Sequence, residues 1–91
     1  MSDGILIFVR KGNYAVLQTN DGLVISVLFP NFYKNSHFDV SKDFLLDIES
    51  LIKARDFESL DHLADDIRKN YSAYQSKEVA QVNMAGKKLI N

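Results

Sequence analysis

The sequence contains no cysteine, and this absence removes several kinds of chemistry at once. Disulfide bonds, thiolate nucleophiles and zinc sites with thiolate ligands are all excluded. A chain without disulfides suits a reducing compartment, and we therefore expect a cytoplasmic protein.

Histidine, clustered glycine and long apolar runs are also lacking. The four glycines are isolated from one another, so no glycine-rich phosphate-binding loop is present. Two histidines are too few for a catalytic zinc site with three histidine ligands. The apolar run at residues 5–9 is far shorter than the roughly 20 residues that cross a bilayer, and Ser2 and Asp3 precede it instead of a basic segment. We expect neither a membrane span nor a signal peptide.

The length and composition indicate one folded domain over residues 1–91. Chains divide into several domains only well beyond 91 residues. Hydrophobic residues make up 46% of the chain and charged residues 25%, as in an ordinary globular protein. We therefore expect the chain to fold.

Three segments near the N-terminus have the composition of β-strands: GILIFVR, YAVLQT and LVISVLF. They are rich in β-branched and aromatic residues, and turn residues separate them. Gly12-Asn13 is typical of a type II′ turn with glycine first, and Asn20-Asp21-Gly22 contains residues that tolerate positive φ. The sequence predicts a three-stranded antiparallel meander over about residues 5–29.

Both faces of this meander are apolar. In the first strand, Ile5, Ile7 and Val9 alternate with Leu6 and Phe8. A solvated antiparallel sheet normally has one polar face, so we expect both faces to be covered. Helices can cover one face, and the other needs the C-terminal segment or another molecule. Coverage by another copy would mean self-association.

The rest of the chain has apolar residues at helical spacing. One helix is predicted to begin near residue 39 or 41 and to end near Ala54, and a second to begin at Asp56 or Ser59 and to continue to Tyr74. Residues 75–86 fit a short helix that ends at Gly86 or an extended segment, and we favour the helix. Residues 87–91 are expected to be a loose tail. The predicted fold is α+β, with two or three helices packed on the meander.

Charge is distributed unevenly along the chain. The total is −1, which gives no reason to expect nucleic acid as a partner. Residues 39–66, however, contain nine of the twelve acids and only three cations. Asp43 with Asp47, and Asp61 with Asp65, are spaced by four residues and are predicted to lie on a solvated helix face. Such a face would attract a partner with a basic surface.

The stretch between strands and helices, residues 28–38, holds four of the ten aromatic residues and the only proline. Phe29 and Phe38 are predicted to join the core, whereas Phe32 and Tyr33 have no periodic partner and are predicted to be exposed. The candidate partner-binding residues are Phe32, Tyr33, His37 and the acid Glu58.

A short resemblance suggests a different function. Arg55, Asp56 and His62 resemble the arginine, polar residue and histidine signature of the higher-eukaryote and prokaryote nucleotide-binding (HEPN) ribonucleases. The resemblance implies an all-helical bundle and an RNA-cleaving role for Arg55 and His62.

The sequence as a whole favours a non-catalytic protein-binding module. We expect no cofactor, a protein partner, and self-association as a homodimer or a higher homo-oligomer. The role would be that of a small regulator or inhibitor of a larger intracellular protein such as a nucleic-acid-handling enzyme, for example a phage-type inhibitor or an antitoxin-like factor. The alternatives are a small-ligand-binding or sequestering homo-oligomer, a small nucleic-acid-binding protein and a ribonuclease.

Overall fold

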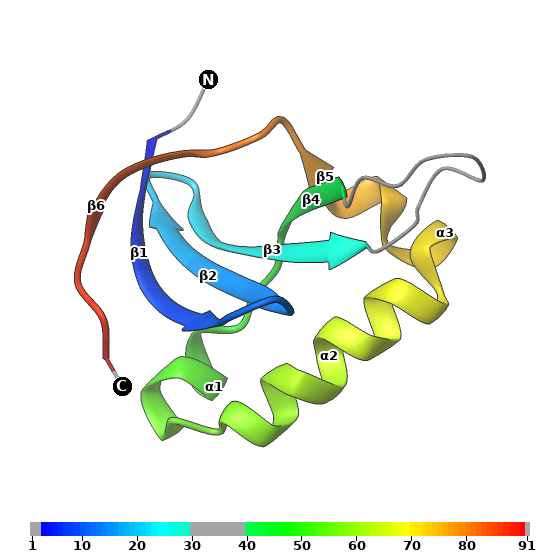
Figure 1. Cartoon of the computed structure of the whole chain (residues 1–91), viewed down its shortest axis with the longest axis horizontal. Coiled ribbons are helices and arrows are strands. Elements are labelled where there is room, and N and C mark those ends of the chain that lie inside the picture. The colour runs from blue at the N-terminus through cyan, green and yellow to red at the C-terminus, as the bar shows by residue number, and fades with distance from the viewer. Residues whose placement is uncertain (1–2, 30–39, 91) are drawn as a thin grey trace.

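The computed structural model describes residues 3–29 and 40–90, which form a curved β-sheet with helices packed against it (Figure 1). The sheet has six strands in the order β5-β4-β3-β2-β1-β6, so the predicted α+β class is confirmed but three strands were missed. The strands are β1 (Asp3–Arg10), β2 (Tyr14–Thr19), β3 (Gly22–Phe29), β4 (Val40–Leu45), β5 (Glu78–Val79) and β6 (Asn83–Lys87). The helices are α1 (Glu49–Ala54), α2 (Phe57–Lys69) and α3 (Tyr71–Tyr74), and a 3₁₀ turn, η1 (Gln75–Lys77), follows α3.

The predicted meander is present, because β1, β2 and β3 pair in antiparallel order through two short turns. The first turn differs from the prediction. The amide of Asn13 donates to the carbonyl of Arg10 at 2.9 Å, so Gly12 is the second central residue of this turn and not the first. Its φ of 75° is the positive value that a type II turn requires at this position.

Residues 40–45 form strand β4, and the helix predicted there begins only at Glu49. The apolar pair Phe44 and Leu45 fits a helical stripe, but on a strand the two side chains point to opposite faces. β4 pairs along its whole length with β3, from Val40 opposite Phe29 to Leu45 opposite Val24. The backbone hydrogen bonds of this pairing join residues that are distant in the sequence. The spacing of apolar residues along the chain contains no information about them.

Helix α2 begins where the sequence predicted. The Asp56 carboxylate accepts hydrogen bonds from the Ser59 amide at 3.2 Å and from the Ser59 hydroxyl at 2.8 Å, which caps the helix. The predicted continuation to Tyr74 is interrupted at Asn70, where φ is −125° and the backbone leaves the helical region. Tyr74 therefore belongs to the separate short helix α3.

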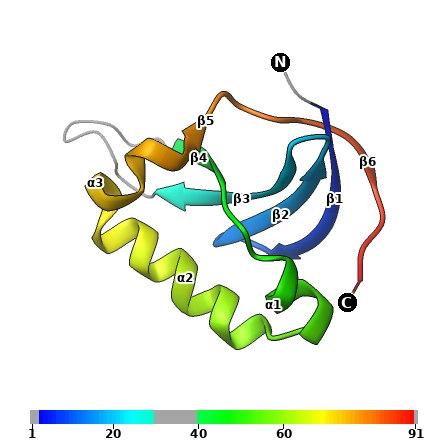
Figure 2. The ribbon, with the colours of Figure 1, turned by 180° about the vertical axis from the view of Figure 1, so that it is seen from behind.

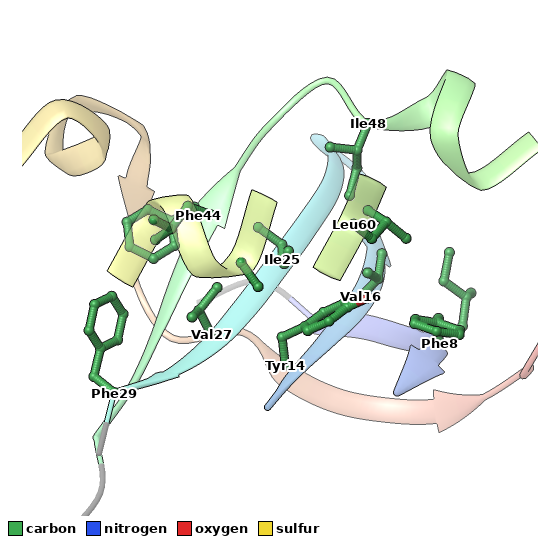
Figure 3. Close-up of a cluster of buried hydrophobic side chains, with 12 residues drawn as sticks. Phe8, Tyr14, Val16, Ile25, Val27, Phe29, Phe44, Ile48 and Leu60 are labelled. Carbon is green, nitrogen blue, oxygen red and sulfur yellow. The ribbon is translucent and has the colours of Figure 1, made fainter. Parts of the chain in front are cut away.

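The main core lies between the helices and one face of the sheet (Figure 3). Phe29 is buried there, as predicted from its place at the end of a strand. The ring of Phe8 stacks on that of Phe57, with 4.3 Å between the ring centroids, and so joins β1 to the start of α2. The side chains that are fully buried include Phe8, Val16, Ile25, Val27, Phe44, Leu60 and Ile67.

The opposite face of the sheet is covered by the C-terminal segment, which was one of the two coverings predicted. Val82 is buried against Leu6, Leu17 and Val24, and this second cluster is separate from the main core. A Cβ atom at Gly4 would lie only 2.7 Å from Val82, so the glycine allows this close approach. Figure 2 shows the chain running from β5, at one edge of the sheet, to β6 at the other.

The C-terminal residues are extended, so the favoured helix ending at Gly86 is wrong. β6 pairs in parallel with β1, and the amides of Lys88 and Ile90 continue this pairing to the carbonyls of Leu6 and Ile7, at 2.8 and 2.9 Å. The loose tail expected from residue 87 onward is therefore also wrong for residues 87–90. Pairing with β1 fixes this segment despite its weak sequence pattern.

Asp43 connects strand β4 to the segment around Val82 that covers the second face of the sheet. It is 4% exposed, and its carboxylate accepts a hydrogen bond of 2.8 Å from the Val82 amide. The prediction that Asp43 lies on a solvated helix face is wrong, because it belongs to β4 and points into the second cluster. A buried amide that loses its acceptor retains the full cost of desolvation.

We predict that Asp43→Ala lowers the free energy of unfolding by about 1–3 kcal/mol, because it leaves the buried Val82 amide without a partner. Urea denaturation measures the effect. Asp47→Ala is the matched control, since Asp47 is exposed and should change stability by no more than about 0.5 kcal/mol. Equal stabilities of the two variants would show that the hydrogen bond from the Val82 amide to Asp43 does not stabilise the fold.

Candidate functional site

Three of the four candidate partner-binding residues, Phe32, Tyr33 and His37, lie outside the described residues, as does Phe38. The fourth, Glu58, is on α2. Its side chain is 88% exposed and lies 3.8 Å from the imidazole of His62, one helical turn away. Of these four residues, the structure therefore locates only Glu58, and it places this side chain on an open surface.

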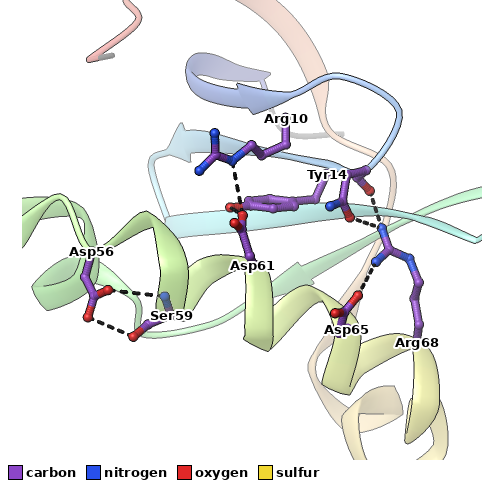
Figure 4. Close-up of polar contacts among 8 residues, drawn as sticks. Arg10, Tyr14, Asp56, Ser59, Asp61, Asp65 and Arg68 are labelled. Atoms are coloured by element: carbon purple, nitrogen blue, oxygen red, sulfur yellow. Dashed lines mark hydrogen bonds and ion pairs between the residues drawn. The ribbon is translucent and has the colours of Figure 1, made fainter.

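The predicted acidic face of α2 is largely compensated within the molecule. Asp61 accepts a hydrogen bond of 2.6 Å from the Tyr14 hydroxyl and forms an ion pair of 3.1 Å with Arg10 (Figure 4). Burial raises the pKa of the Tyr14 phenol, and its bond to Asp61 raises it further. The same bond, assisted by Arg10, lowers the pKa of Asp61.

Arg68 joins the other end of α2 to the turn before β2 and to the end of β3. Its guanidinium donates to the carbonyl of Leu28 at 2.7 Å and to that of Asn13 at 2.6 Å, and it also contacts the Asn13 side chain. Asp65 forms an ion pair with this guanidinium at 3.1 Å (Figure 4). Asp61 and Asp65 thus belong to contacts that position α2, which reduces the charge they offer to a partner.

Uncompensated acids gather instead around a cavity beside α1. The cavity has a volume of about 540 Å³, within the range of ligand pockets. Its rim carries Asp21, Asp47, Glu49 and Lys53. Glu49 pairs with Lys53 at 3.0 Å, whereas Asp21 and Asp47 form no ion pair with any described residue. The apolar lining consists of Ile7, Leu23, Leu45, Leu46, Ile48 and Ile52.

The second notable surface is the C-terminal edge, by which we mean residues 83–90. β6 is the last strand of the sheet, and no described segment lies beyond it in either view (Figures 1 and 2). Because the amides of Lys88 and Ile90 point to β1, the backbone groups of Lys87 and Leu89 point away from the sheet. These outward groups are available to another strand.

Exposed apolar side chains concentrate near this edge. In the described part of the chain, the large apolar residues that are exposed all belong to β1 or to the C-terminal edge: Ile5, Val9, Met84 and Leu89. Met84 is the most exposed of them, at 56%. Lys87 and Lys88 stand among these residues and form no ion pair with any described residue. The edge is therefore both apolar and positively charged.

The residues that resemble a HEPN signature have structural contacts. Arg55 takes a left-handed φ of 54° at the end of α1, and its guanidinium donates to the Ile90 carbonyl at 2.9 Å. His62 faces solvent beside Glu58. The six-stranded sheet also differs from the all-helical bundle that the resemblance implied.

Residues 3–29 and 40–90 also bear on metal sites and membrane spans. Within these ranges no three histidine or acidic side chains come close enough together to hold a metal ion. None of the helices described there is long and apolar enough to cross a membrane. No protein-family model, curated protein or solved structure matches the chain. We therefore argue function from the cavity beside α1 and from the C-terminal edge.

We predict that Tyr14→Phe lowers the free energy of unfolding by about 1 kcal/mol near neutral pH, because Asp61 loses a hydrogen-bond donor. Asp61 has a lowered pKa in the folded protein, so its contribution to stability is present above the ordinary aspartate pKa. The contribution disappears as the pH falls through the lowered value. The difference between wild type and variant should therefore shrink in acid.

Urea denaturation over a series of pH values tests this prediction, together with NMR titration of the Asp61 carboxyl group. The titration should show the pKa of Asp61 rising toward its ordinary value in Tyr14→Phe. Asp61→Asn serves as the control, since in that background Tyr14→Phe should have little pH-dependent effect. A stability difference that is constant at every pH would contradict the coupling of Tyr14 to Asp61.

Proposed function

We propose that this chain is a non-catalytic protein-binding module that binds an extended segment of its partner as an additional strand beside β6. The observation that carries the proposal is that the backbone groups of Lys87 and Leu89 point away from β1, on a side of β6 where no described strand pairs. Addition of a strand to a sheet edge is a common mode of peptide recognition, in which backbone hydrogen bonds give affinity and side chains give specificity.

The backbone of the edge supports this mode. Lys88 and Ile90 are held to β1 by their amides, so the strand is already ordered before a partner arrives. An ordered edge spares the partner complex the entropic cost of fixing this segment. The neighbouring outward groups, those of Lys87 and Leu89, can then pair with an incoming strand.

The side chains of the edge favour a particular class of partner. Met84 and Leu89 offer apolar contacts, and Lys87 and Lys88 add two positive charges. Lysine on an edge strand discourages pairing with uncharged or basic segments. An extended segment that carries both apolar and acidic side chains relieves this repulsion and gains electrostatic attraction. A small chain that occupies such a segment would act as a regulator or inhibitor of the protein that contains it.

Panning a displayed library of random peptides against the immobilised protein tests the proposal. We predict that selected peptides combine acidic and apolar residues, and that Leu89→Pro weakens their binding by about tenfold or more. Proline removes the outward amide of Leu89 while leaving the two amides that bind β1 intact.

Leu89→Ala is the matched control, because it shortens the side chain but keeps the amide. It should weaken binding less than Leu89→Pro does. Failure to select any peptide, or equal binding by wild type and Leu89→Pro, would overturn the proposal. Circular dichroism of each variant checks that the fold is retained.

A further inference from the structure

We propose that the cavity beside α1 receives the C-terminal edge of a second copy of this chain, and that two copies exchange this contact around a two-fold axis. This inference goes beyond the proposed function, because it uses the side chains of the same edge and names a second copy as their partner. An isologous dimer of this kind requires each copy to carry both complementary surfaces.

The charges of the two surfaces are complementary. Two carboxylates at the cavity rim, those of Asp21 and Asp47, form no ion pair with any described residue, and the same is true of two ammonium groups on the edge, those of Lys87 and Lys88. In the dimer, the two carboxylates of one copy would lie beside the two ammonium groups of the other copy. Opposite charges at an interface favour encounter and fix its register.

The apolar parts also correspond. Leucine and isoleucine side chains line the cavity, and Leu89 and Met84 project from the edge at 47% and 56% exposure. Inserting an apolar side chain into a lined cavity removes apolar surface of both copies from water. A small cationic ligand would neutralise the rim but leave the exposed side chains of the edge uncovered, so a second copy accounts for more of the surface.

The two surfaces lie next to each other in one molecule, which a two-fold exchange needs. The side chain of Ile7 lines the cavity, while its carbonyl accepts the Ile90 amide at the end of the edge. Arg55, which follows α1, donates to the Ile90 carbonyl. A two-fold axis near this point brings the edge of each copy toward the cavity of the other.

Sedimentation equilibrium of the full chain, at micromolar to millimolar concentration and low salt, measures the association. We expect a dimer in the wild type. Asp21→Lys with Asp47→Lys, and separately Lys87→Asp with Lys88→Asp, should each weaken it by about tenfold or more. Combining all four reversals should restore association, because the charges become complementary again.

Lys69→Glu is the control, since it reverses an exposed charge on α2 outside both the cavity and the C-terminal edge and should leave association unchanged. All five reversed positions are exposed, so the variants should fold, and thermal unfolding checks this. A monomeric wild type would overturn the inference, as would a dimer that charge reversal does not weaken. A monomer that is stabilised thermally by small alkylamines would assign the cavity to a small ligand instead.

The peptide selection described above separates this inference from the proposed function. If the cavity does not receive a second copy but the edge does bind strands, the selected peptides bind while the charge reversals at Asp21 and Asp47 change nothing. If the edge does not bind strands, no peptide depends on the Leu89 amide, whereas the effect of charge reversal on the dimer is still measured independently.

Discussion

The fold depends on how the second face of the sheet is closed. Val82 fills this face against Leu6 and Leu17, and Asp43 accepts its amide. These contacts require the chain after η1 to cross the sheet in an extended form, which takes the C-terminal residues to the far side of β1 (Figure 2). If the residues after β5 were helical, they would span a shorter distance and would not reach from β5 to the opposite edge of the sheet. Both the closure of the core and the exposed C-terminal edge therefore follow from one packing arrangement.

The irregularity in β1 connects this closure to the candidate site. The register with β2 shifts between Leu6 and Phe8, so Ile7 is an extra residue in the strand. Successive carbonyls, of Leu6 and Ile7, can then both accept amides from the C-terminal edge. The same residue turns its side chain to the cavity beside α1. A single bulge thus brings the edge and the cavity to one end of the molecule.

The sequence predicts well several features that local chemistry decides, such as the positions of the two hairpins and the Asp56 cap of α2, although the type of the turn at Gly12 was predicted wrongly. It predicts less well the features that partners distant in the chain decide. Residues 40–45 and 83–87 became strands because β3 and β1 offered edges to pair with. The apolar character of both faces of β1 was the available signal for the covering segment. It predicted that something covers the second face without indicating the conformation of that segment.

The acids of α2 also show that sequence spacing does not predict partners that are distant in the chain. Spacing by four residues placed Asp61 and Asp65 correctly on one helix, but it contained no information about the Arg10 and Arg68 guanidinium groups that pair with them. Asp21 and Asp47 at the cavity rim, and Lys87 and Lys88 on the C-terminal edge, have no ion pair among the described residues. In the dimer that we propose, these opposite charges would meet beside the exposed apolar side chains of the edge. Electrostatic and apolar contributions to that association would then favour the same orientation.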